Sequence, residues 1–576
     1  DVYKRQIAHS NFGNTVVGNF DTSLNSGNSF IYDIPTNTYS AVPLVGKSYD
    51  SGKQITAVTT NTAYGVYNNL ISGGYTGNYN GTIGTYAYIY NQSNDKTYSF
   101  ASPDGSLATH FEGITSAGKP GVYNLVADGV DTDGQTVKAY VATVDLNTID
   151  NVTGQPEVYW TEISVGRFLV SANSMYQGNV IGVYLDNGVT RSFQANIGNL
   201  DYAGSGTPIY QPKTNTGSIS TTLSGDGWDV INSGNISVSG GNGITSGSDC
   251  GYYQCTTQTQ YGGVITNNGT VTVNGGSGNS AILMQGTFGT LLNNGTLNAS
   301  TGNYALKTTG SGASAAVGTL VVNTGTIDGQ VSIDAGPYAR FENSGFLGVT
   351  SSGANVSQSI SGTFVQTSNG TLGIRVQPTS NDQLNVDGNA YLGGKLTISA
   401  TGNFSVGQKT TVVNATNGLS GQFSSLTTNI SNVSWLSYDD DNAYWVFGAS
   451  PTATQLSVQQ NSQGLSTVIN QQVAALHAGL SYDCDRFDEN NLCVSVGGRY
   501  TMAGSGASSN AEAGLLILGY LPSPEFRFGV FTDQSANIST PSGITQSKSS
   551  PMWGFFGNWQ MNKDRSGLGV HASAAF

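Results

Sequence analysis

The residues that could carry chemistry are few and lie far apart in the sequence. The four histidines, His9, His110, His477 and His571, show no spacing typical of a zinc site. The chain also has no Gly-x-Ser-x-Gly elbow, no His-Glu-x-x-His helix and no phosphate-cradling loop. We therefore predict no catalytic centre, no cofactor and no metal site, and we expect no enzymatic activity.

A short acidic stretch follows part of the calcium-loop pattern. Asp128, Asp131, Asp133 and Gly134 lie close together in the sequence. Counted from Asp131, however, the ligand pattern fails at the fifth and twelfth positions, where such a loop needs oxygen ligands. We expect a solvated turn here instead.

The four cysteines form two local pairs, Cys250 with Cys255 and Cys484 with Cys493. We predict a disulfide within each pair, as in proteins of oxidising compartments, with free thiols as the alternative. Each bridge closes only a small loop and adds limited stability.

The last hundred residues carry the pattern of membrane-spanning β-strands. Apolar and small residues alternate with polar ones in five segments: 492–500, 511–521, 525–533, 551–560 and 566–576. Segments of about ten residues with this period suit an outer-membrane β-barrel, because lipid offers no partner for open backbone groups. Five apolar side chains of the last two segments are predicted to face lipid: Trp553, Phe555, Trp559, Leu568 and Val570. We interpret 480–576 as the first part of an antiparallel outer-membrane barrel of about five strands.

The predicted connections alternate in length. Loop 501–510 and the stretch 533–550 are polar, whereas 522–524 and 562–565 are tight turns. Outer-membrane barrels alternate long outside loops with short periplasmic turns. The first predicted strand therefore rises from the periplasm.

A helix is predicted directly before these strands, within 449–479. Leu465, Ile469, Val473 and Leu476 recur at helical spacing, and the opposite face is polar but almost uncharged. A helix of this composition suits a narrow polar lumen, with its N-terminus and all preceding residues outside the cell. The alternative is an ordinary helix packed on a β domain.

A short phrase beginning with Asn and containing Gly recurs between residues 231 and 349. Its glycines are Gly234, Gly269, Gly295, Gly325 and Gly345. Repeats at this interval indicate stacked coils, each burying its apolar face only against its neighbours. We predict a right-handed β-helix (a β-solenoid) over 204–365, in which each glycine supplies a turn with positive φ. The alternative is a disordered tract rich in Gly, Ser and Thr.

Residues 7–203 are rich in tyrosine and carry a longer repeat. Segment 14–20 matches 69–75, and 30–40 matches 88–99, with fainter copies around 139–141 and 181–184. Units of about fifty residues suggest four-stranded, propeller-like blades or stacked sheets. The whole chain is thus expected to be all-β apart from the one linker helix.

The C-terminal two-fifths resemble a monomeric autotransporter of the type V secretion pathway. Helix 452–479, followed by Ala511-Glu512-Ala513-Gly514-Leu515 and Trp553-Gly554-Phe555-Phe556-Gly557, is similar to its translocator. Segments 370–376, 382–386, 390–396, 419–423 and 436–439 resemble the pertactin-like end of a passenger, called the autochaperone. The family barrel has about twelve strands, so the chain departs from it by supplying about five.

The resemblance implies a role for each part of the chain. Residues 366–448 would nucleate folding outside the cell, with their core formed by Leu384, Val386, Leu392 and Leu396. The barrel would lie in the outer membrane of a Gram-negative bacterium and the passenger at the cell surface. The implied partners are outer-membrane lipid, the barrel-assembly machinery, periplasmic chaperones, and a ligand on a host or neighbouring cell.

The passenger is expected to be an adhesin or a structural stalk, because a repetitive solenoid presents area rather than a pocket. Two alternatives stay open: an enzymatic activity in 7–203, which would need convergent acids or a nucleophile, and a trimeric adhesin whose chains share one barrel. The net charge of −14 and pI near 4.5 argue against a nucleic-acid partner.

The chain starts without Met and without the pattern of a signal peptide. Residues 1–6 resemble a translated sequencing adapter. We therefore set 1–6 aside as non-native and expect both ends to be truncated.

Overall fold

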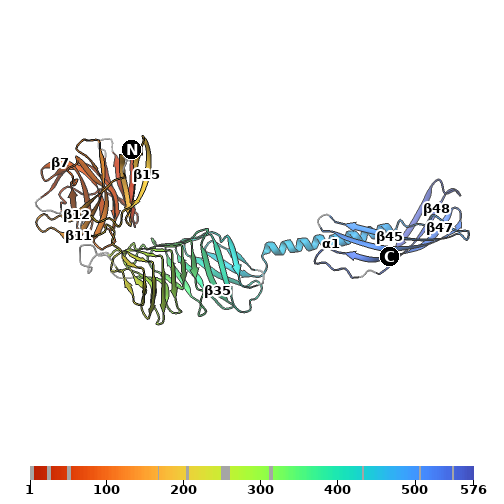
Figure 1. Ribbon diagram of the computed structural model, residues 1–576. Coiled ribbons are helices and arrows are strands. Elements are labelled where there is room, and N and C mark those ends of the chain that lie inside the picture. Colours follow the sequence, from red (N-terminus) through yellow and green to blue (C-terminus); the bar gives the residue numbers. More distant parts are fainter. Residues whose placement is uncertain are drawn as a thin grey trace. The chain divides into compact units, whose positions relative to one another are not determined.

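The computed structural model describes residues 5–21, 27–48, 53–165, 168–202, 206–247, 260–310, 315–430, 434–504, 507–547 and 550–576. Two compact units are present, Asp1–Gly448 and Ala449–Phe576 (Figure 1). Most described residues lie in β-strands, and the described part contains one helix. The expectation of a mostly β protein is therefore confirmed.

The N-terminal part of the first unit is a succession of antiparallel meanders, in which consecutive strands pair. The first meander is β1 (Arg5–Phe12), β2 (Thr15–Asp21), β3 (Asn28–Asp33) and β4 (Thr38–Ser40). The second is β5 (Ile55–Tyr67), β6 (Leu70–Tyr79), β7 (Thr82–Asn91) and β8 (Lys96–Phe100). The third is β9 (Ala108–Ser116), β10 (Val122–Val130), β11 (Val137–Ile149) and β12 (Pro156–Ile163). The fourth is β13 (Phe168–Tyr176), β14 (Asn179–Asp186) and β15 (Val189–Asn196).

The sequence repeat of this region maps onto equivalent strands. Segments 14–20 and 69–75 fall on β2 and β6, the second strands of their meanders. One parallel bridge, Thr85 to Ala108, joins the second and third meanders into an eight-stranded sheet. Strand β1 begins at Arg5, so the fold includes two of the six residues that we set aside.

The described residues between Lys213 and Thr428 form stacked coils, which contribute one short strand each to three parallel sheets (Figure 1, yellow-green to cyan). We call this part the coil region. The first sheet is β16 (Lys213–Asn215), β19 (Val230–Asn232), β22 (Val264–Asn267), β25 (Thr290–Asn293), β28 (Leu320–Asn323), β31 (Arg340–Asn343), β34 (Thr363–Gln366), β38 (Ala390–Leu392) and β41 (Leu419–Gly421). The second is β17 (Ser218–Ile219), β20 (Asn235–Ser239), β23 (Thr270–Asn274), β26 (Thr296–Ala299), β29 (Thr326–Asp328), β32 (Phe346–Gly348), β35 (Thr371–Gln377), β39 (Lys395–Ala400) and β42 (Ser425–Thr428), with β36 (Ser380–Asn381) beside β35.

The third sheet contains β18 (Leu223–Ser224), β21 (Ile244–Thr245), β24 (Ser280–Met284), β27 (Tyr304–Thr308), β30 (Gln330–Ile333), β33 (Ser357–Ser361), β37 (Gln383–Asp387) and β40 (Lys409–Ala415). It ends in an antiparallel hairpin, β43 (Ser434–Tyr438) and β44 (Asn442–Phe447), which pairs with β40. The parallel sheets run through residues 365 and 366 without a break. The predicted division at that point therefore marks no change of architecture.

Apolar columns and a ladder of amides hold the coils together. Val271, Leu297, Ile327 and Leu347 succeed one another in the second sheet and are fully buried. A ladder of side-chain amides runs along the coils, in which each asparagine donates from Nδ2 to the side-chain oxygen of the next member over 2.7–3.1 Å and Gln366 is the last acceptor. The ladder consists of Asn215, Asn232, Asn267, Asn293, Asn323, Asn343 and Gln366. Stacked amides satisfy one another's donors and acceptors in a core that excludes water.

The recurring glycines serve a purpose other than the predicted one. Gly269, Gly295, Gly325 and Gly345 are not among the residues with positive φ. A Cβ at any of these positions would instead lie 2.0 Å from the carbonyl oxygen of the glycine in the preceding coil. Glycine is required because the coils approach too closely for a side chain, so the predicted turn geometry was wrong.

The second unit consists of helix α1 (Pro451–Gly479) and a five-stranded antiparallel sheet (Figure 1, blue). Its strands are β45 (Leu492–Ala503), β46 (Ser509–Ser523), β47 (Phe526–Ser539), β48 (Met552–Gln560) and β49 (Gly569–Ala575). The first three strands are longer than predicted, because pairing continues into parts of 501–510 and 533–550. The connections are correspondingly shorter.

Helix α1 begins and ends close to its predicted bounds. The Ser450 Oγ accepts a hydrogen bond from the Ala453 N–H at 3.1 Å, and Pro451 occupies the first turn, where its missing N–H costs nothing. Across the described residues, no helix is long and apolar enough to cross a membrane.

Candidate functional site

The C-terminal sheet exposes its apolar face. All five residues predicted to face lipid are exposed, with Trp553 at 50%, Phe555 at 56% and Leu568 at 70% of their accessible surface. Neighbouring strands extend this surface, and its further members are Val494, Val496, Tyr500, Met502, Leu516, Leu518, Tyr520, Phe526, Phe528 and Val530. A contiguous apolar surface of this extent on one face of a sheet indicates a membrane or a protein partner.

The opposite face of the same sheet carries buried ion pairs. Arg499 on β45 donates from Nε and Nη2 to the two carboxylate oxygens of Asp533 on β47, at 2.7 and 3.0 Å. The Tyr482 hydroxyl donates to the same carboxylate at 2.8 Å. Both charged side chains are nearly inaccessible, at 9% for Arg499 and 1% for Asp533. The inner face thus combines buried ion pairs with a small apolar cluster of Ile517, Phe531 and Phe556, whereas the outer face exposes apolar side chains that a sheet in a water-soluble domain would cover.

A second ion pair follows on the same inner face. Arg527 on β47 donates from Nε to Asp483 at 3.0 Å, and Asp483 belongs to the segment that leaves helix α1. The Ser573 hydroxyl on β49 donates to the carbonyl of Leu480, the C-terminal cap of the helix, at 2.5 Å. These contacts fasten the end of the helix to the inner face of the sheet.

Helix α1 meets the sheet and the loop after β47 along a face of mostly polar and small residues. Gly464, Thr467, Val468 and Gln471 are buried there, and the Ser509 hydroxyl donates to the Gln471 side-chain oxygen at 2.8 Å. A hollow of about 310 Å³ lies between the last turns of the helix and the sheet. Arg499 and Asp533 line it.

The predicted lumen residues of the helix occupy another face. Leu465, Ile469, Val473 and Leu476 are between 42% and 54% exposed, and only Leu476 lines the hollow. The sequence correctly placed them on one stripe, but the five described strands cover the adjacent stripe. The apolar stripe is left without a covering strand among the described residues.

The predicted disulfide residues fall into two groups. Cys484 and Cys493 form a disulfide with a Cα–Cα distance of 6.2 Å, and both are buried. The bridge ties the segment after the helix to the start of β45. Cys250 and Cys255 lie outside the described residues.

The predicted autochaperone core residues are buried together in the coil region. Leu384 and Val386 on β37, Leu392 on β38 and Leu396 on β39 are all at most 7% exposed and belong to one apolar cluster. They come from three different sheets of the same stack. Trp445 on the closing hairpin is fully buried in that cluster.

The candidate calcium residues are split between two environments. Asp133 accepts hydrogen bonds from the backbone N–H groups of Gln135 and Thr136, and Gly134 has a φ of +68°, so this segment is a tight turn as predicted. Asp128 instead lies on β10, in a cluster with His110 and Glu112. Sequence reasoning missed this cluster, because pairing of β9 with β10 is what brings its members together.

No protein-family model, no curated protein and no solved structure matches this chain.

Proposed function

We propose that the chain is part of an outer-membrane autotransporter of the type V pathway, which exports its own N-terminal passenger to the cell surface. The observation that carries this proposal is the exposed outer face of the C-terminal sheet, which consists of aromatic and aliphatic residues, while paired charges are buried on the inner face. Exposed apolar side chains are stable in contact with lipid, and paired charges are stable in a lumen filled with water or a helix.

Helix α1 acts in this proposal as the segment that threads the lumen. The hydrogen bond between Gln471 and Ser509, and the ion pair of Arg527 with Asp483 just after the helix, hold it against the inward face. In the proposal, further strands cover its apolar stripe. Within the described residues, β45 and β49 each have a partner strand on one side only. We propose that additional strands pair with these edges and close the sheet into a barrel around the helix.

The coil region is the proposed passenger stalk, a right-handed β-helix, and residues 366–448 its folding nucleus. Stacked coils bury apolar surface one after another, so folding from this end outside the cell hinders back-sliding through the pore. The hairpin of β43 and β44 suits a nucleus, because it closes the third sheet with antiparallel pairs and the buried Trp445. Burial of apolar surface then drives export without ATP.

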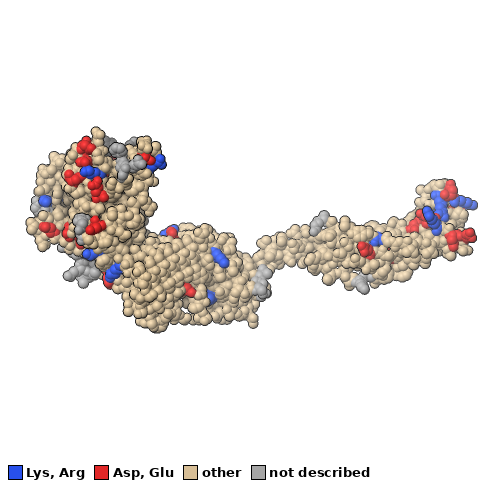
Figure 2. Space-filling model, viewed as in Figure 1, with Lys and Arg blue, Asp and Glu red and all other residues tan. Residues whose placement is uncertain are grey.

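The passenger itself is proposed to be an adhesin or a structural surface protein. Charged residues are sparse over the coil region and gather on the N-terminal meanders (Figure 2). We propose that these meanders are propeller-like blades, held at the end of the stalk, that contact a host or neighbouring cell. Outer-membrane lipid, the barrel-assembly machinery and periplasmic chaperones are the remaining proposed partners.

Lipid binding by the C-terminal sheet tests the membrane proposal. The 576-residue chain should float with vesicles of phosphatidylethanolamine and phosphatidylglycerol in a density gradient, and the double variant Phe555→Asp, Trp559→Asp should not. The matched control is Val317→Asp with Tyr338→Asp, two exposed apolar residues of the coil region. Equal flotation of both double variants would refute a lipid-facing role for the sheet.

Export is tested separately in Gram-negative cells that express the protein with a secretion signal. Added protease should cleave the coil region on intact cells, while a periplasmic marker survives. Leu384→Asp with Leu396→Asp should sharply reduce this surface exposure, because both side chains are fully buried in the proposed nucleus. Unchanged exposure of residues 204–365 would show that 366–448 does not nucleate folding.

A further inference from the structure

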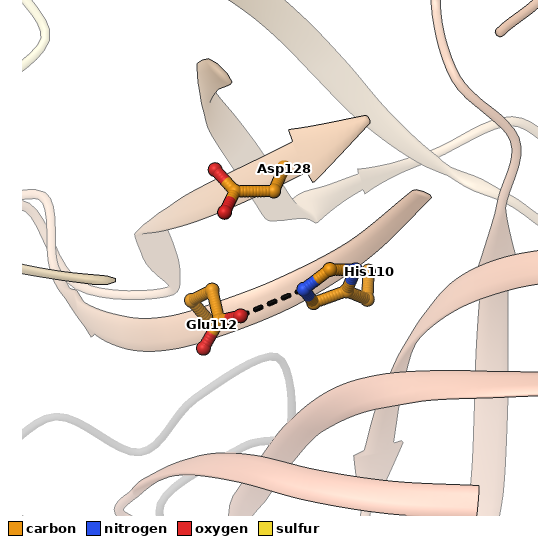
Figure 3. Close-up of side chains that lie close together, drawn as sticks. All are labelled: His110, Glu112 and Asp128. Carbon is orange, nitrogen blue, oxygen red and sulfur yellow. Dashed lines mark hydrogen bonds and ion pairs between the residues drawn. The ribbon is translucent and has the colours of Figure 1, made fainter. Parts of the chain in front are cut away.

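Three metal-ligating side chains converge between strands of the N-terminal meanders (Figure 3). His110 and Glu112 belong to β9, and Asp128 belongs to β10, directly opposite His110 in the pairing of the two strands. The His110 Nε2 lies 2.7 Å from a carboxylate oxygen of Glu112. One donor atom from each of the three residues lies within 4.8 Å of the other two.

An irregularity of the strand gives the cluster its shape. The pairing of β9 with β10 shifts between Val126 and Ala127, so that Glu112 is an extra residue on β9. Such a bulge re-aims a side chain and is frequent beside functional sites. Phe111, the neighbour of the bulged residue, is fully buried in the core on the other side. The core thus anchors the strand while His110 and Glu112 point into the cluster.

The surroundings hold the three side chains in place. The Ala172 N–H donates to the Asp128 carboxylate at 3.0 Å, which fixes the orientation of that group from strand β13. The ring of Tyr64 lies 5.3 Å from the His110 ring. On β6, a Cβ at position 74 would lie 2.5 Å from the His110 Cβ, so Gly74 leaves the space that His110 occupies.

The charges of the cluster do not balance. Two carboxylates face one imidazole, and Asp128 is only 5% exposed. A buried excess of negative charge is relieved by a bound cation.

We propose that His110, Glu112 and Asp128 bind a divalent transition-metal ion, of which Zn²⁺ is the best match. Zinc accepts imidazole nitrogen and carboxylate oxygen at about 2.0–2.2 Å, which places the ligand atoms about 3.3 Å apart in a tetrahedron. The ion replaces the proton between His110 Nε2 and the Glu112 carboxylate, and the distance between these two groups increases from 2.7 Å. The Ala172 N–H serves as the outer hydrogen bond that orients a ligating carboxylate.

The donor set selects among ions. Calcium and magnesium take oxygen ligands, so the imidazole disfavours them, and the absence of thiolate among the three ligands disfavours Cu(I). Zinc is bound more tightly than Mn²⁺ or Fe²⁺ by a given set of nitrogen and oxygen ligands. The His110 and Glu112 side chains are 31% and 17% exposed, so the fourth position is open to water. Three protein ligands and one open coordination position are typical of catalytic zinc sites, whereas structural zinc sites have four protein ligands.

Zinc titration of the 576-residue chain tests the site. The protein is stripped with a chelator, kept under non-reducing conditions and titrated with Zn²⁺ against a chromophoric competitor. We expect one Zn²⁺ per chain, and at least about tenfold weaker binding in Glu112→Gln and in His110→Gln. The matched control is His477→Gln, which removes an exposed histidine of helix α1 and should leave the affinity unchanged.

A second measurement separates ligation from folding. Co²⁺ bound in place of Zn²⁺ should give a visible absorption spectrum that Glu112→Gln alters, while circular dichroism of the metal-free variant matches that of the wild type. Glu112→Gln decides the case if His110→Gln fails to fold. Wild-type zinc affinity in Glu112→Gln, or no zinc bound by the wild type, would overturn the proposal.

Discussion

The coil region and the C-terminal sheet are both built of β-strands, but they place their apolar side chains differently. In the coil region, Leu297 and Ile327 point into a core and each ladder asparagine is paired with the next coil. In the C-terminal sheet, Val530 and Phe555 point outward, and the charges of Arg499 and Asp533 are hidden inside. The comparison teaches that the side on which apolar residues lie, rather than their number, indicates the medium for which a sheet is built.

The largest difference between the two regions is expected when one apolar residue of each is replaced by aspartate. Leu297→Asp places an unpaired charge in the coil core and should cost more than about 4 kcal/mol of unfolding free energy. Val530→Asp lies on a half-exposed position and should cost less than about 0.5 kcal/mol in water, yet it should prevent flotation with vesicles. Hydrogen exchange of peptides from 264–299 and 526–539 measures each effect locally. Equal loss of protection in both regions would contradict the assignment of Val530 to an exposed apolar face.

The inner face of the C-terminal sheet gives the next largest effect. Asp533→Ala leaves the Arg499 guanidinium buried without its partner and should destabilise the unit by about 3–5 kcal/mol. The double variant Arg499→Leu, Asp533→Leu removes both charges and should recover most of that loss. Urea unfolding in detergent micelles checks the difference. A double variant no more stable than the single one would show that the pair does not act as a unit.

A substitution in the amide ladder of the coil region should have a smaller effect on stability. Asn293→Ala removes the acceptor of one Asn267 N–H and the amide that donates to the buried Asn323 oxygen, and it should cost about 1–3 kcal/mol. Asn268→Ala is the matched control, because Asn268 is exposed beside the same coil. Thermal unfolding followed by circular dichroism checks both. A similar loss in the two variants would show that the ladder adds nothing beyond ordinary surface asparagines.

Local periodicity predicted much of the fold. The spacing of Leu465, Ile469, Val473 and Leu476 indicated a helix, and the alternation of Trp553, Phe555 and Trp559 indicated a strand with one apolar face, because helix and strand periods are properties of neighbouring residues. The coil repeat was visible for the same reason. Strand ends were less predictable, since pairing with a neighbour extends β47 to Ser539 through polar residues.

What the sequence could not indicate depends on neighbours that are distant in the chain. The sequence assigned no role to the asparagine at the start of each recurring phrase, and only stacking shows that Asn267 and Asn293 pair in the core. The recurring glycines were explained by turn geometry, whereas carbonyl groups of the preceding coil exclude a side chain. His110 and Asp128 meet only because β9 and β10 pair in one register.

The smallest effect concerns the hairpin that closes the coil region, and it depends on pH. The Tyr444 hydroxyl donates to the Asp439 carboxylate, as do the side chain and N–H of Asn442, and these hydrogen bonds lower the pKa of Asp439 to about 2. Because the pKa in the folded state lies below the ordinary value of 3.8, the hydrogen bonds stabilise the hairpin above pH 3.8 and are lost as the pH falls toward 2. Hydrogen exchange of 434–447, corrected for intrinsic rates, should therefore quicken over this range, and Asp439→Asn should abolish the pH dependence while Asp440→Asn preserves it. Asp439→Asn should leave the exchange of the C-terminal strands unchanged at each pH, because the hydrogen bonds described for the Asp439 side chain lie within its own hairpin. A pH dependence that survives in Asp439→Asn would assign the effect to another carboxylate.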